Sequence, residues 1–311
     1  MNDEKPIDAT EQARQEKLKQ LEKDFYELKS YQKKKLKFLY PTFFVPGWTS
    51  ENCATWKYPY TPNKPNKFYE THYSKYYRPM LDWINEVVDN KNDAHYITFS
   101  EQETSKSFDF VSLGKHLKNK VAELTKDSPV NLVGHSMGGL DIRAAILDNE
   151  RPKLNIKNVI TVGTPNNGES ESWFLGFRII REWAQRFKGY TPYHIAQARS
   201  MFSKGPFIQS INSVENRLKL LNDVSSFYVF MGFRDFVVKG SPKLSVDGID
   251  ENLRKKIKLF QIPFDEHTGE FEITQDPNTI LPILKILCGI EIKDTLNRGI
   301  FKKGIYKPST L

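Results

Sequence analysis

The chain of 311 residues has only two cysteines, Cys53 and Cys288, and they lie far apart in the sequence. Two cysteines cannot form a framework of several disulfides, so unpaired thiols are the simpler interpretation and a single bridge is the alternative. No apolar run reaches the length of about 18 residues that predicts a transmembrane helix. Residues 1–39 also lack the apolar core of a signal peptide. These absences favour a cytoplasmic chain, with peripheral contact to a membrane as the alternative.

Other patterns are missing as well. The sequence has no zinc-ligand spacing, no RNA-binding signature and no stripe of arginines interleaved with aromatic residues. We therefore expect neither a metal site nor a nucleic-acid partner. The formal net charge of +8 suits an anionic membrane surface or an acidic substrate, although it is equally compatible with a simple role in solubility.

The composition that remains is that of a globular protein. Hydrophobic residues make up 39% of the chain and aromatic residues 13%, which is enough to bury a core. We expect a charged helical extension over residues 1–38, one α/β domain over 39–290 and a C-terminal tail over 291–311. In the extension, apolar residues recur at helical spacing and are followed by a basic cluster; they are Leu18, Leu21, Phe25 and Leu28, then Lys33, Lys34, Lys35 and Lys37. A solvated helix packed along the domain edge is the favoured interpretation, and attraction to an anionic membrane is the alternative.

The domain alternates short apolar runs with amphipathic stretches. The runs predict strands at Tyr40–Val45, His95–Phe99, Val130–Val133, Val159–Val162, Phe227–Met231 and Ile257–Ile262. Helical spacing predicts helices at Tyr77–Val88, Phe108–Leu124, Met137–Leu147 and Ile280–Leu287. Such alternation is typical of βαβ units, so we predict a mostly parallel central sheet flanked by helices.

One segment carries a nucleophile pattern. Gly134-His135-Ser136-Met137-Gly138 is a G-x-S-x-G sequence between an apolar strand and a helix. A sharp turn of this kind holds a serine in a strained backbone conformation and lifts its hydroxyl clear of the sheet, and the two glycines avoid collisions with neighbouring backbone. The turn also places the amide of Met137 at a helix N-terminus, where it favours a developing oxyanion.

The residues GHSMGGLDIR resemble the nucleophile elbow of α/β-hydrolase lipases and esterases, and VITVGTPNNGES resembles the strand and turn that follow it. The resemblance covers roughly residues 40–289. It implies the α/β-hydrolase fold, with a helical lid or cap inserted at about residues 169–222. That insertion has apolar residues at helical spacing, including Trp173, Phe177 and Ile180, which either line an acyl pocket or pack on their own core.

In this fold the chain order is serine, acid, histidine. His267 lies in the polar loop after the last predicted strand, where the resemblance places the base; His194, inside the insertion, is the alternative. Asp235 follows the preceding strand in a loop that resembles the Gly-x-x-Asp-x-x-Val loop of the family, and it fits better than Asp223 or Asp247. A surface pair with Arg234 is the other interpretation of Asp235.

The second oxyanion donor is expected after the first central strand. There Gly47 lets the backbone approach the substrate, and the amide of Trp48 is the expected donor. Most lipases have His-Gly at this point, whereas this chain has Pro46-Gly47, which resembles the lecithin:cholesterol acyltransferase-like branch.

Together these features predict a serine hydrolase of carboxylic esters, similar to lipases and esterases, that acts on small-molecule or lipid esters. It would form an acyl-enzyme on Ser136 with Asp235 and His267, and it would need no cofactor. An acyltransferase or thioesterase with the same triad is one alternative, and a non-catalytic lipid-binding protein of this fold is another.

Overall fold

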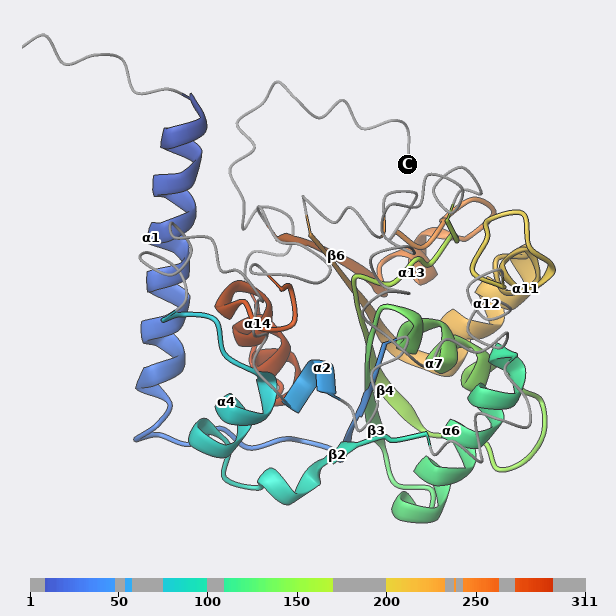
Figure 1. The fold of residues 1–311 in the computed structure, drawn as a ribbon. Helices are drawn as coiled ribbons and strands as arrows, with labels where there is room; N and C mark the ends of the chain where they lie inside the picture. The colour runs from blue at the N-terminus through green and yellow to red at the C-terminus, as the bar shows by residue number, and fades with distance from the viewer. Residues whose placement is uncertain are drawn as a thin grey trace, which may run out of the picture.

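A computed structural model describes residues 9–47, 54–57, 75–99, 109–169, 200–232, 238, 243–262 and 272–292. A six-stranded sheet runs through this part of the chain, in the order β2-β1-β3-β4-β5-β6 (Figure 1). The strands are β1 (Thr42–Val45), β2 (Ala94–Tyr96), β3 (Val130–His135), β4 (Ile156–Val162), β5 (Val224–Gly232) and β6 (Ile257–Ile262). Every neighbouring pair is parallel, which confirms the predicted class of sheet.

The helices are α1 (Ala9–Ser30), α2 (Ala54–Lys57), α4 (Met80–Val87), α6 (Phe110–Thr125), α7 (Met137–Leu147), α11 (Pro206–Ile211), α12 (Val214–Asp223), α13 (Glu251–Arg254) and α14 (Pro277–Leu287). Short polar side chains fix where several of them begin. Asp109 accepts a hydrogen bond from the Ser112 amide at the start of α6, and Ser213 accepts one from Asn216 at the start of α12. Each cap satisfies an amide that has no partner within its own helix.

Strand side chains alternate between two apolar cores. One face of the sheet packs against α4 and α14 and includes Phe44, Val133, Ile160 and Phe230. The opposite face packs against α6, α7 and α12 and includes Phe43, Leu132, Val159 and Phe227. A sheet covered on both faces needs apolar side chains at successive positions, which explains the continuous apolar runs in the sequence.

The N-terminal helix α1 lies outside α14, which separates most of it from the sheet (Figure 1). Leu21 and Leu28 on α1 are fully buried. The Phe25 ring meets the Trp83 ring of α4 edge-on, with centroids 5.5 Å apart, and Glu27 forms an ion pair with Lys285 of α14. The helix is therefore attached to the domain by its apolar stripe. No helix in the described ranges combines the length and the apolar character needed to cross a bilayer.

The predicted lid falls partly outside the described residues. Trp173, Phe177 and Ile180 all lie there, so their role stays a prediction. The later part of the predicted insertion, residues 200–222, forms α11 and α12. Ile208, Ile211, Leu220 and Leu221 are buried there against the rest of the domain, so this part contributes to the core.

Candidate active site

Ser136 occupies the turn between β3 and α7. Its backbone has φ 53° and ψ −124°, a region that side-chain-bearing residues rarely adopt. Its amide donates a hydrogen bond to the Val162 carbonyl of β4 at 2.8 Å, which fixes the turn to the neighbouring strand. Strain held in place by surrounding structure is characteristic of functional sites, and this strand–serine–helix turn is the geometry that the G-x-S-x-G sequence predicts.

The two glycines of the turn lie where no side chain fits. A methyl group on Gly134 would come within 2.6 Å of the Gly139 nitrogen, and one on Gly138 within 2.4 Å of the Pro46 carbonyl oxygen. These contacts are with backbone, which cannot move aside cheaply. Glycine at both positions therefore allows α7 to begin directly beside β1 and β3.

The segment after β1 lies against the serine. A methyl group on Gly47 would be 3.1 Å from the Ser136 Cβ and 3.0 Å from the His135 Nδ1, so the Gly47 backbone closely borders the turn. Strand β1 pairs with β3 with Val45 opposite Gly134, which brings this segment to the carboxyl edge of the sheet. Trp48, the predicted second oxyanion donor, is the next residue and lies outside the described residues.

The helix N-terminus supplies the other expected donor. Met137 is the first residue of α7, and the amides of the first helical turn have no acceptor within the helix. The helix dipole favours negative charge at the same place. An oxyanion formed on a group attached to Ser136 would therefore meet a positive electrostatic potential.

A buried arginine ties the turn after β4 to the helix that begins at the serine. The Arg143 guanidinium on α7 is fully buried and donates to the Asn166 carbonyl at 2.6 Å, the Ile211 carbonyl at 2.9 Å and the Asn212 Oδ1 at 2.8 Å. Burial, with a smaller contribution from Arg217, lowers the pKa of Arg143 to about 9, so the group stays protonated at neutral pH. One positive charge thus anchors two loops around α7.

The same turn also touches α7 directly. A methyl group on Gly139 would come within 2.2 Å of the Thr164 Oγ1, so the turn after β4 packs closely on the first turn of α7. Gly163 and Gly168 in this turn have φ of 55° and 76°, which glycine adopts without strain.

Sequence reasoning gave no role to Arg143, Asn166 or Asn212. The sequence nevertheless contained a signal for buried polar contacts. Asp141 and Arg143 are ionisable residues in a helix that is otherwise apolar or glycine around almost its whole circumference. Such residues in a buried helix require partners, and Arg143 has them.

Asp235 and His267, the predicted acid and base, lie outside the described residues. The strands that lead to them are described. Asp235 comes three residues after the end of β5, and His267 five residues after the end of β6. Because β3, β5 and β6 are parallel, these loops leave the edge of the sheet that carries Ser136.

The segment that follows the His267 loop is buried and polar. Thr274 Oγ1 donates to Glu272 Oε1 at 2.7 Å, and Asp276 accepts from the Tyr77 hydroxyl at 2.9 Å and from the Asn278 amide at 2.6 Å. These contacts anchor the start of α14 to the segment that leads into α4. The loop carrying His267 therefore runs between two fixed ends, β6 and α14.

His135, next to the nucleophile, is buried and packs edge-on against the Trp56 ring, with centroids 6.2 Å apart. Packing of this kind agrees with the interpretation of His135 as a structural residue of the turn. Within the described ranges, no three His, Cys, Asp or Glu side chains lie close enough together to hold a metal ion.

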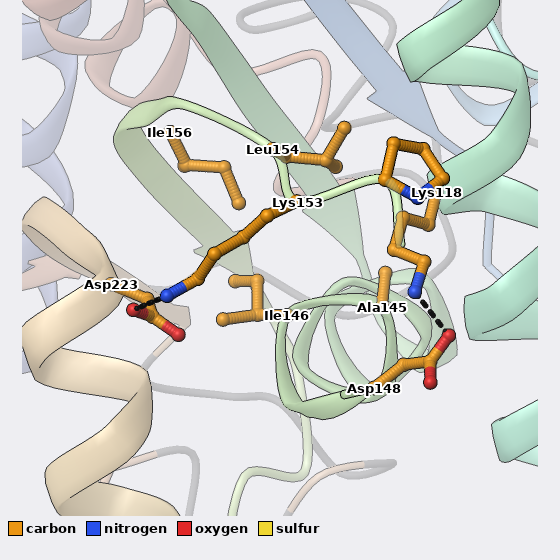
Figure 2. A pocket seen from close by; sticks show the side chains of 9 residues that line it. Lys118, Ala145, Ile146, Asp148, Lys153, Leu154, Ile156 and Asp223 are labelled. Carbon is orange, nitrogen blue, oxygen red and sulfur yellow. Dashed lines mark hydrogen bonds and ion pairs between the residues drawn. The ribbon is translucent and has the colours of Figure 1, made fainter. Parts of the chain in front are cut away.

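A separate hollow lies at the other end of α7, about 16 Å along the helix from Ser136 (Figure 2). Its volume is about 10 Å³, the room for a single water molecule. Its charged side chains face partners: Lys118 pairs with Asp148, and Lys153 pairs with Asp223 at 2.8 Å. This hollow is thus too small and too far from the serine to be the substrate site.

The parallel sheet order, together with a strained serine at a strand-to-helix turn, defines an α/β-hydrolase fold. A family profile described as alpha/beta hydrolase fold matches residues 93–237. The chain therefore has the α/β-hydrolase fold. A search of curated proteins gave no match.

Solved structures that match this chain share little of its sequence. A bromoperoxidase from Bacillus anthracis is 17% identical, with 80% of this chain and 91% of that chain covered and a TM-score of 0.50. The phospholipase PlaB from Legionella pneumophila is 15% identical, with 79% and 59% covered and a TM-score of 0.50. The mature lipase BlEst2 from Bacillus licheniformis is 21% identical, with 80% and 91% covered and a TM-score of 0.43. At these identities the likeness concerns the fold alone.

Proposed function

We propose that this protein is a serine hydrolase of carboxylic esters, with Ser136 as its nucleophile. The observation that carries the proposal is the strained Ser136 backbone at the start of α7, with the Gly47 segment directly against it. A fold without chemistry would have no need to maintain a side-chain-bearing residue at φ 53° in a tight turn.

The proposed reaction uses Ser136 together with the predicted acid and base. The Ser136 Oγ attacks the ester carbonyl while His267 takes the hydroxyl proton, and Asp235 orients the imidazole. The amides of Met137 and Trp48 donate to the oxyanion of the tetrahedral intermediate. The C–O bond to the alcohol then breaks, and the alcohol leaves with the proton from His267. Water repeats the sequence on the acyl-enzyme and releases the acid. The loops after β5 and β6 support the roles of Asp235 and His267, because they leave the sheet at the serine's edge.

A fluorophosphonate probe tests the nucleophile directly, because it reacts with an activated serine whatever the natural substrate. We expect the wild-type protein to be labelled on Ser136 and the Ser136→Ala variant to remain unlabelled. Ser112→Ala, which changes a serine on α6, is the matched control and should be labelled like the wild type. An unlabelled wild type, or equal labelling of Ser136→Ala, would contradict the proposal.

The base and the acid are tested by turnover of p-nitrophenyl esters. His267→Ala and Asp235→Asn should each lower kcat by several orders of magnitude, as losses from catalytic triads do. The kcat/KM of the wild type should rise with pH as His267 loses its proton. A mild effect of His267→Ala would move the base to His194, and normal turnover of Asp235→Asn would remove Asp235 from the triad.

A further inference from the structure

The exposed charges described on α1 and on the segment that follows it are all of one sign. Among residues 15–39 with described side chains, every exposed charged residue is a lysine. We call this set the outer lysine face; it consists of Lys19, Lys23, Lys33, Lys34, Lys35 and Lys37. Within the described ranges, none of these lysines forms an ion pair with an acidic side chain, and Lys35 donates to the backbone carbonyl of Glu86.

Three of the four acidic residues between positions 15 and 39 are held in contacts within the fold. Glu22 accepts a hydrogen bond from the Tyr76 hydroxyl at 2.6 Å, and Glu27 pairs with Lys285 on α14. Asp24 is fully buried and accepts from Gln20 at 3.0 Å. These three acidic side chains thus bind groups of the fold. The lysines of the outer lysine face form no ion pair with an acidic side chain in the described residues.

Two exposed apolar side chains belong to the same stretch of chain as the lysines. Tyr26 is 64% exposed and Leu39 is 58% exposed. Lys19, Lys23, Tyr26 and Ser30 are spaced by three or four residues, so they form one stripe along α1, on the side away from α14. Exposed lysines suit electrostatic attraction to an anionic membrane surface, where tyrosine side chains are also favoured.

We propose that the outer lysine face binds an anionic lipid bilayer. Lysine is a compact point charge that is attracted to a charged surface without needing a fixed geometry. Bidentate recognition of phosphates favours arginine, and the outer lysine face contains none. The exposed Tyr26 and Leu39 side chains can remove apolar surface from water in the lipid interface. A polyanion in water provides no such apolar environment. The proposal is independent of the activity of Ser136.

Co-sedimentation of the full chain with vesicles tests the proposal. We expect binding to phosphatidylcholine vesicles that contain about one third phosphatidylserine, weak binding to phosphatidylcholine alone, and release as salt is added. Each lysine near the surface contributes roughly a fivefold change in partition coefficient. The double variant Lys33→Glu/Lys34→Glu should therefore bind at least about twentyfold more weakly, and Tyr26→Ser should weaken binding by a smaller factor.

The matched control is Lys204→Glu/Lys255→Glu, which makes the same charge change at exposed lysines outside the outer lysine face. It should retain most of the binding, and thermal unfolding should show all variants to be folded. Equal binding to both vesicle types, equal loss in the control, or no loss in Lys33→Glu/Lys34→Glu would overturn the proposal. Tighter binding to a DNA or RNA duplex than to the anionic vesicles at the same salt concentration would also overturn it.

Discussion

Asp141 is a buried carboxyl group one and a half turns after the nucleophile on α7. Its side chain is fully buried, and among the residues that the structure describes none donates a hydrogen bond to either of its oxygens. Burial therefore raises the pKa of Asp141 well above its usual value. A carboxyl group without a partner is more stable in its protonated, neutral form, so the folded protein keeps this proton to a higher pH than the unfolded chain does.

This retained proton makes stability depend on pH. Below the pKa of the unfolded chain, Asp141 is protonated in both states, so its titration does not change the free energy of unfolding. As pH rises above that value, the unfolded chain ionises first, so the free energy of unfolding falls by up to about 1.4 kcal/mol per pH unit until the folded pKa is reached. Asp141→Asn does not titrate and should remove this loss. Urea denaturation at about pH 5 and about pH 8 should show that the variant gains stability relative to the wild type as pH rises. A stability difference that is the same at both pH values would show that Asp141 does not titrate in this range.

At the scale of the element, α1 is expected to behave as part of the core. Leu28 is fully buried in the same apolar cluster as α14 and the sheet. Leu28→Ala should therefore lower the free energy of unfolding by about 2–4 kcal/mol, through lost burial and the cavity left behind. The control Leu124→Ala removes the same atoms from a side chain on α6 that is 59% exposed, and it should change stability by less than about 0.5 kcal/mol. Equal effects of the two variants in urea denaturation would mean that α1 is only loosely attached.

Elements with strong apolar periodicity were predicted from the sequence almost to the residue. The bounds of α7 and β6 agree with the prediction, because each is bordered by residues of a different pattern. Helix α14 begins at Pro277, three residues earlier than predicted, because Asp276 caps it and proline suits the first helical turn. Strand β4 begins at Ile156, three residues earlier than predicted. The prediction relied on an apolar run, which the half-buried Lys157 and Asn158 interrupt.

Helices α11 and α12 could not be predicted in the same way. They lie in a stretch that interrupts the alternation of strands and helices, and local spacing does not say whether an amphipathic helix packs on the domain or forms a lid. The candidate site likewise combines a feature that local sequence predicts with contacts that it does not predict. The G-x-S-x-G pattern located Ser136 because the turn is local, whereas the Arg143 contacts with Asn166, Ile211 and Asn212 join residues 23 to 69 positions apart. No local pattern predicts contacts of that range.

At the scale of the whole molecule, the sheet connects both apolar cores, so the described elements should unfold together. The cluster that contains Leu28 of α1 also contains Val133 of β3 and Leu284 of α14, with no polar layer dividing them. Strand β3 contributes Leu132 to the core on the other face. A helix attached only by surface contacts is expected to detach from the domain at low denaturant concentration. A helix that shares a core with the sheet is expected to lose its protection from hydrogen exchange together with that core.

Hydrogen exchange followed by mass spectrometry across a urea series measures this directly. Peptides from the buried half of α1, from α14 and from β3 should lose protection at the same urea concentration, because exposing Leu28 opens the core that supports the sheet. Leu28→Ala should lower that concentration for all three peptides together, while Leu124→Ala should leave it unchanged. If the α1 peptide alone loses protection early, and the other two keep the wild-type midpoint in Leu28→Ala, then α1 is a separate unit whose attachment does not stabilise the hydrolase domain. The outer lysine face would in that case sit on a helix that can detach while the serine site remains folded.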